Sequence, residues 1–392
     1  MHLTPADKLI LASVKIHPTA DELDYLNSLI PQIENWDYLV QNIIDRGIGP
    51  LFFKKLPQLS DNLLVPTDVQ TKLQQAYYRT LSRGMVLYGA FGKIAEAFNA
   101  NGIQVIALKG IYLAETLYKD IALRQFSDID LLVKEEDGEK CLVILQDLGY
   151  ISYESKVSDF GGTLSEIIHY PAMVCNDVSV EVHIKLHRKT ERYNLKLEDL
   201  WNNALLVTLN NFPIYTFEYD DLLIYLCIHL DKHFRGGHIQ FTCFNDITNL
   251  LVSLSNSIDW NLFIKSCEKY NCLDIVFKYL IMCNVNFQAP LPHSIIDKYK
   301  HLLTKDDQIV FEKYLIGYTG VSNHMTSHII NLNQLSTFSD RLSYFVEALF
   351  PPKSFMLEKY NIQHPSLVLL YYPYRYYIGI KQLVYLLRNR KK

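Results

Sequence analysis

The chain has 392 residues, a formal charge of −4, and a hydrophobic fraction of 49%. This length exceeds that of a typical single domain, so we expect two or three structural units with enough apolar content to bury a core. The mildly acidic balance disfavours a protein that binds nucleic acid over a broad basic face.

The first region, residues 1–101, is predicted to be helical. Apolar residues recur at helical spacing from Thr67 to Asn101 and predict one long helix there. Asn101 and Gly102 form a good helix C-terminal signal.

The second region, residues 102–217, mixes short apolar strands with helices. Asn176-Asp177 is typical of a hairpin turn, and a second turn is predicted at Asn211-Phe212-Pro213. This mixture predicts an α+β fold in which a small mixed-sheet core is flanked by N-terminal and C-terminal helical regions. The predicted strands are IQVIAL, DIDLLV, ISYES, IIHYPAMVC, VSVEVHI, LLVTL and PIYTF.

Asp128 and Asp130 lie one residue apart at the start of the apolar strand DIDLLV. Residues i and i+2 of a strand point to the same face, so the two carboxylates stand side by side. Such a pair suits Mg²⁺, which prefers oxygen ligands and is usually held by one or two carboxylates plus substrate phosphates. The alternative is an edge strand whose aspartates only face water.

A third carboxylate is predicted at Glu181. The stretch DVSVEVHIKLH alternates polar and apolar residues, so Ser179, Glu181, His183 and Lys185 share one strand face. An ordinary solvated strand would show the same alternation, so only the nearby Asp-x-Asp strand favours a site.

These residues carry a resemblance to a known family. ALKG at residues 107–110, Arg124, and SDIDLLV at residues 127–133 resemble the uncharacterised nucleotidyltransferase family of the DNA polymerase β-like nucleotidyltransferase superfamily. That family replaces the superfamily's common Gly-Ser turn by Lys-Gly, as Lys109 and Gly110 do here.

The resemblance implies Mg²⁺ or Mn²⁺ held by Asp128, Asp130 and Glu181, and a nucleoside triphosphate as substrate. Lys109 and the Gly110 backbone amide are expected against the β- and γ-phosphates, because a strand-to-helix turn presents amides to an anion. Arg124 is expected to make a bidentate phosphate contact.

The expected reaction moves a nucleoside monophosphate to a hydroxyl of a small-molecule or protein acceptor and releases pyrophosphate. Two alternatives remain open. One is a catalytically silent nucleotide-binding regulatory module, and the other is a toxin-like nucleotidyltransferase that acts on tRNA or protein.

The third region, residues 218–392, is predicted to be helical. Asp220 is the expected cap of a helix that brings His229, Lys232 and His233 within one turn of each other. These three residues form either a structural stripe or a triphosphate contact, and they are second-rank candidates together with His183. The resemblance also reaches FNDITNLL and makes Asp246 a second-rank candidate.

The remaining expectations concern location and redox state. The seven cysteines show no CxxC spacing and are expected to be reduced core residues. No secretion signal or membrane span is predicted, so we expect a cytoplasmic protein. The aromatic and basic C-terminal segment is expected to pack on its own domain, with a membrane surface or an anionic partner as the alternative.

Overall fold

A computed structural model describes residues 3–59, 64–152, 168–187, 191–236, 239–255, 257–316, 350, 356, 360 and 364–377. Most of the predicted strand ISYES, the start of the predicted strand IIHYPAMVC and the basic end of the chain lie outside these residues.

Helices form the first part of the chain, as the sequence predicts. Thr4 caps the first helix, because its hydroxyl accepts from the Asp7 amide while the Asp7 carboxylate accepts from the Thr4 amide. The helices are α1 (Pro5–Ala12), α2 (Ala20–Leu29), α3 (Trp36–Asp45), α4 (Gly49–Lys55) and the long α5 (Thr67–Ala100), with short 3₁₀ turns at Ile30–Gln32 and Leu56–Gln58.

A mixed sheet follows, and it confirms the predicted α+β class. Its seven strands lie in the order β3-β4-β5-β2-β1-β7-β6. The β1–β7 and β2–β5 pairs are parallel, whereas the other neighbours are antiparallel. The strands are β1 (Val105–Ala107), β2 (Asp128–Val133), β3 (Ile151–Ser152), β4 (Met173–Cys175), β5 (Val178–His183), β6 (Leu205–Leu209) and β7 (Phe212–Thr216). The helices between them are α6 (Lys109–Thr116), α7 (Gly138–Asp147) and α8 (Leu197–Asn203).

Two asparagine-rich turns set the register of the hairpins. Asn176 and Asp177 have φ of 47° and 63° and join β4 to β5, as predicted. The β6–β7 turn is one residue earlier than predicted, at Asn210 and Asn211 with φ of 49° and 67°. Asparagine tolerates the left-handed backbone, so Phe212 is free to start the strand.

Helices continue beyond the sheet. The predicted cap is wrong, because α9 (Tyr219–Gly236) already includes Asp220, whose amide donates to the Glu218 carboxylate at 2.8 Å. The following helices are α10 (Phe241–Leu254), α11 (Trp260–Lys269), α12 (Leu273–Phe287), α13 (His293–Tyr299) and α14 (Lys305–Leu315).

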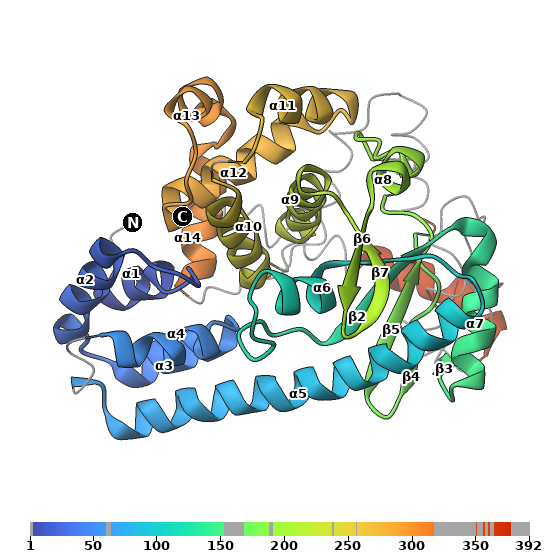
Figure 1. Ribbon diagram of the computed structural model, residues 1–392, viewed down its shortest axis with the longest axis horizontal. Coiled ribbons are helices and arrows are strands. Elements are labelled where there is room, and N and C mark those ends of the chain that lie inside the picture. The colour runs from blue at the N-terminus through green and yellow to red at the C-terminus, as the bar shows by residue number, and fades with distance from the viewer. Residues whose placement is uncertain are drawn as a thin grey trace.

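One hydrophobic cluster runs from Leu9 to Leu315 through the N-terminal helices, the sheet and the C-terminal helices. In Figure 1, α5 extends along one side of the molecule, and α9 to α14 gather on the opposite side of the sheet region. The division into three regions stays a prediction. All seven cysteines are free, and six of them are buried. Among the described residues, no helix is long and apolar enough to cross a membrane.

Candidate functional site

The sheet brings the three predicted carboxylates together. Asp128 and Asp130 lie on β2, and β5 runs parallel beside it with Asp130 paired to Glu181. Asp128 is paired to Ser179 in the same register. Because side chains alternate along each strand, the three carboxylates share one face of the sheet.

Asp130 is the centre of this cluster. Its Oδ2 atom lies 3.1 Å from Lys109 Nζ, and its Oδ1 atom lies 2.9 Å from His183 Nε2. The same His183 nitrogen lies 3.5 Å from Glu181 Oε2. The Asp130 side chain is only 6% exposed, whereas that of Glu181 is 28% exposed. A buried carboxylate therefore has a cation on one oxygen and an imidazole on the other.

The surroundings shift the pKa values of the three carboxyl groups in different directions. Burial opposes ionisation of Asp130, but the Lys109 ammonium and the His183 hydrogen bond outweigh it and hold the pKa of Asp130 well below its usual range. Burial and the negative charge of Asp130 raise the pKa of Asp128. The hydrogen bond from His183 lowers the pKa of Glu181.

His183 contacts two of the three carboxylates, Asp130 and Glu181. Burial favours its neutral form, yet the hydrogen bonds to Asp130 and Glu181 prevail and raise the pKa of the imidazole. His183 was only a second-rank candidate from the sequence. The structure places it between Asp130 and Glu181, two first-rank candidates.

Lys109 occupies an unusual backbone position at the start of α6. Its φ is 43°, in the left-handed region that residues with a side chain seldom adopt. The Leu108 amide donates to the Asp130 carbonyl at 3.0 Å, which places this turn against β2. Strained backbone of this kind concentrates at functional sites and points to a role for Lys109.

Gly110 has a steric role that the sequence did not reveal. A Cβ atom at this position would lie 2.9 Å from Phe126 Cβ, closer than real Cβ contacts allow. The glycine therefore lets the start of α6 pack directly on the residue two positions before Asp128. Its predicted amide contact to phosphate stays a prediction.

Helix α9 contributes three aromatic side chains on one face. His233 Nε2 lies 3.0 Å from His229 Nε2, so one of the two rings donates and the other accepts. Burial, followed by the nearby Lys109 charge, lowers the pKa of His229 well below its usual value. Tyr225 lies beside Lys109, and burial raises the pKa of its phenol. The sequence analysis missed Tyr225, although its spacing of four from His229 places both on one helix face.

Lys232 contacts the segment that follows β5. Its Nζ atom donates at 2.8 Å to the carbonyl of Leu186, three residues after the end of β5. This contact joins α9 to the strand that carries Glu181.

Arg124 and Asp246 form a buried ion pair with each other. Arg124 Nε donates to Asp246 Oδ1 at 2.9 Å, and Arg124 Nη2 donates to Asp246 Oδ2 at 2.6 Å. The Tyr118 hydroxyl also donates to Asp246 Oδ1 at 2.9 Å. The bidentate partner of Arg124 in this structure is thus a carboxylate of α10, where the sequence analysis expected a phosphate.

Arg83 on α5 is a second residue that the sequence analysis missed. Its Nη2 atom donates to the Ser127 carbonyl at 2.7 Å and to the Asp177 carbonyl at 3.0 Å. These carbonyls directly precede β2 and β5, so Arg83 ties together the starts of the two carboxylate-bearing strands. No local sequence pattern links a helix position to strands that lie so much later in the chain.

The donor set fits a divalent cation. Ligand atoms of Asp130, Glu181 and His183 all lie within 4.8 Å of one another, and Asp128 adds a further carboxylate beside them. Carboxylate oxygens suit Mg²⁺ and Mn²⁺, and the imidazole nitrogen is better tolerated by Mn²⁺ than by Mg²⁺. The depressed pKa of Asp130 keeps that ligand ionised.

The fold and the site together define a mixed sheet that gathers three carboxylates and a lysine. The sequence profile of a family described as uncharacterised nucleotidyltransferase matches residues 32–288, well over half of the chain. The chain belongs to this nucleotidyltransferase family, which confirms the resemblance in its sequence and assigns it to nucleotidyl transfer as a class of reaction.

Two solved structures are similar to this chain. The solution structure of the antibiotic-resistance factor ANT(2'')-Ia has 12% identity and a TM-score of 0.35, and the match covers 48% of this chain and 96% of that one. The crystal structure of an antigenic nucleotidyltransferase-like protein from Paracoccidioides brasiliensis has 14% identity and a TM-score of 0.30, with 57% and 97% covered. These low TM-scores add no support to a functional assignment. A comparison with curated protein sequences gave no match.

Proposed function

We propose that this chain transfers a nucleoside monophosphate from a nucleoside triphosphate to a hydroxyl of a small-molecule or protein acceptor, with Mg²⁺ or Mn²⁺ as cofactor. The observation that carries the proposal is the pairing of Asp130 with Glu181 on parallel strands, with Asp128 on the same face. Membership of the nucleotidyltransferase family supports the reaction class.

The reaction exchanges one phosphorus–oxygen bond for another. The acceptor hydroxyl oxygen attacks the α-phosphorus, and the bond from that phosphorus to the β-phosphate oxygen breaks. Pyrophosphate leaves, and the hydroxyl proton passes to the carboxylate cluster. A divalent cation bound there would offset charge on the phosphate oxygens and polarise the reacting groups.

The chain's own residues have separable tasks in this proposal. Asp128, Asp130 and Glu181 would hold the cation, and His183 would keep the Asp130 carboxylate in position through its 2.9 Å contact. Lys109 already lies at the edge of the cluster, where its ammonium can meet a phosphate oxygen as well as Asp130.

The proposal is tested by calorimetric titration of ATP, GTP, CTP and UTP, each with Mg²⁺. We expect at least one to bind the wild-type chain and to lose its binding in an Asp128→Asn/Asp130→Asn variant. The nucleotide that binds is then supplied with a label on the α-phosphate to a panel of hydroxyl-bearing small molecules and proteins, with pyrophosphate release measured in parallel.

A matched control changes two other acids near the sheet. An Asp137→Asn/Asp147→Asn variant removes the same charge from positions at the two ends of α7. It should bind nucleotide as the wild type does. Equal binding by the Asp128→Asn/Asp130→Asn variant, with the same metal dependence, would remove the aspartates from the proposal.

A further inference from the structure

A polar cavity lies between the N-terminal helices and the segment that leads into β2. Its volume is about 550 Å³, within the range of roughly 300–1,000 Å³ usual for small-molecule sites. The lining comes from α3, α4 and α5 and from Arg124, Gln125, Phe126 and Ser127.

The cavity is positively charged. Arg79 and Arg83 line it from successive turns of α5, and neither forms an ion pair with a carboxylate in the described part of the chain. Arg124 also lines the cavity, but Asp246 neutralises it. Asp45 is the acid of the lining, so the two unneutralised arginines leave a net positive charge.

The rest of the lining divides into a polar and an apolar part. Ile44, Pro50 and Phe126 offer apolar surface, while Thr80, Gln125 and Ser127 add polar groups. A free phosphate ion would fill only a small part of such a volume. The combination suits a phosphate group attached to a larger, partly apolar body.

We propose that this cavity binds a small organic phosphate, with the guanidinium groups of Arg79 and Arg83 on the phosphate. Arginine presents a planar fork of donors that matches phosphate oxygens. The exposed Arg79 and the half-buried Arg83 lie four residues apart, on one face of α5.

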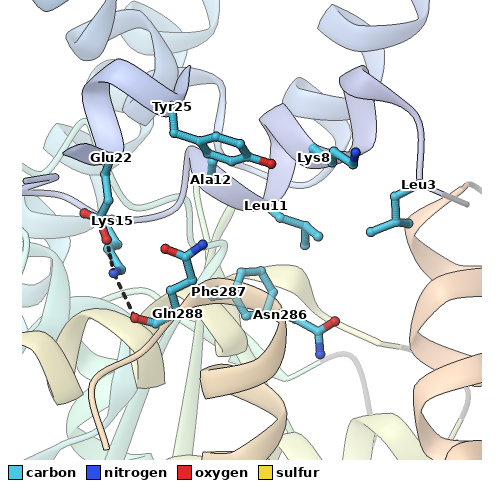
Figure 2. A pocket seen from close by; sticks show the side chains of 10 residues that line it. All are labelled: Leu3, Lys8, Leu11, Ala12, Lys15, Glu22, Tyr25, Asn286, Phe287 and Gln288. Atoms are coloured by element: carbon cyan, nitrogen blue, oxygen red, sulfur yellow. Dashed lines mark hydrogen bonds and ion pairs between the residues drawn. The ribbon is translucent and has the colours of Figure 1, made fainter. Parts of the chain in front are cut away.

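A smaller cavity in the described part of the chain is a weaker site for an anion. It lies between α1, α2 and α12 and has a volume of about 170 Å³. Figure 2 shows its Lys15 side chain joined to Glu22 and to the carbonyl of Gln288, the latter at 2.9 Å. This lysine is already neutralised, whereas Arg79 is not.

Arg83 connects the proposed phosphate site to the carboxylate site. The Arg83 guanidinium, which would bind the phosphate, also donates hydrogen bonds to the carbonyls of Ser127 and Asp177. An occupied cavity would therefore fix the positions from which β2 and β5 begin. The proposed binding does not require nucleotidyl transfer, since it uses none of the three carboxylates.

The test is calorimetric titration of AMP and inorganic phosphate, with adenosine as the uncharged comparison, in the presence of EDTA. We expect AMP to bind and adenosine not to bind. AMP binding should weaken at least tenfold in Arg79→Gln and remain in Asp128→Asn/Asp130→Asn. The latter variant separates this site from the proposed nucleotide site.

Lys93→Gln is the matched control, because it removes one positive charge from an exposed position of α5 about 21 Å further along the helix. It should leave AMP affinity unchanged. The proposal is overturned if AMP does not bind, if adenosine binds as tightly as AMP, if Arg79→Gln binds AMP as tightly as the wild type, or if the aspartate variant loses the binding.

Discussion

His183 and Asp130 form the closest contact within the carboxylate cluster, with 2.9 Å between His183 Nε2 and Asp130 Oδ1. The imidazole comes from β5 and the carboxylate from β2, so the contact crosses the parallel strand pair. Because the same nitrogen lies 3.5 Å from Glu181, His183 fixes the relative positions of two of the three acids.

Removing this imidazole should weaken metal binding. We expect His183→Gln to lower the affinity for Mn²⁺ about 10- to 100-fold, since residues that orient or complete a ligand set have effects of this size. Electron paramagnetic resonance of free Mn²⁺ during a titration measures the change.

His187→Gln is the control for the loss of an imidazole. His187 meets Tyr193 edge to face, with ring centroids 5.5 Å apart, and lies outside the carboxylate cluster. If both variants bind Mn²⁺ with wild-type affinity, His183 has no part in the metal site.

The Arg124–Asp246 pair should contribute mainly to stability. Arg124→Met leaves Asp246 buried and unpaired, so we expect the free energy of unfolding to fall by about 3–5 kcal/mol. Removing both charges in Arg124→Met/Asp246→Leu should cost less than the sum of the single changes. Urea unfolding of the four proteins in this cycle measures the coupling. Additive losses would show that the two side chains do not depend on each other.

Gly110→Ala should destabilise the chain by about 1–3 kcal/mol, because its Cβ has no room beside Phe126. Gly89→Ala provides the comparison. A Cβ at Gly89 meets no atom within 4 Å, and alanine favours the helix interior by about 1 kcal/mol. The two substitutions should therefore change the urea midpoint in opposite directions. A shift of the same sign and size would contradict the close packing at Gly110.

The sequence predicted the parts of the site that follow from strand periodicity. Asp128 and Asp130 share a strand face through their i, i+2 spacing, and Glu181 occupies a polar position of an alternating strand. The parallel pairing of β2 and β5 brings the three together. The long helix α5 and the Asn176-Asp177 turn were also visible as local patterns.

Contacts between distant segments were not predictable in this way. Arg124 carries the same charge whether it meets a phosphate or Asp246, and only the packing of α10 decides between them. Arg83 contacts the starts of β2 and β5, and Tyr225 lies beside Lys109, from helices on either side of the sheet region; a local pattern does not give that arrangement.

Lys55, which lies outside the carboxylate cluster, makes the free energy of unfolding depend on pH. Its Nζ donates to the Ser13 carbonyl at 3.0 Å, and burial lowers its pKa to about 7. Below that pH the lysine is charged in both states. Between pH 7 and about 10.4 the unfolded chain binds the proton more tightly, so stability rises with pH.

Urea unfolding between pH 6 and pH 9 measures this effect. From pH 7 to pH 9 the unfolding free energy of the wild type should rise by about 2 kcal/mol relative to Lys55→Met. Lys54→Met is the neighbouring control, since Lys54 is half exposed and its pKa is raised. Its curve should run parallel to that of the wild type. If the curve of Lys55→Met also ran parallel to that of the wild type, the lowered pKa of Lys55 would be contradicted.

The central claim is that the carboxylates of β2 and β5 form one site for a metal ion and a nucleotide. Anomalous diffraction from crystals grown with Mn²⁺ and a non-hydrolysable nucleoside triphosphate tests it most directly. The account predicts a manganese peak within bonding distance of Asp130 and of Asp128 or Glu181, with the phosphates beside Lys109. Nucleotide bound elsewhere, with no manganese at these carboxylates, would contradict it.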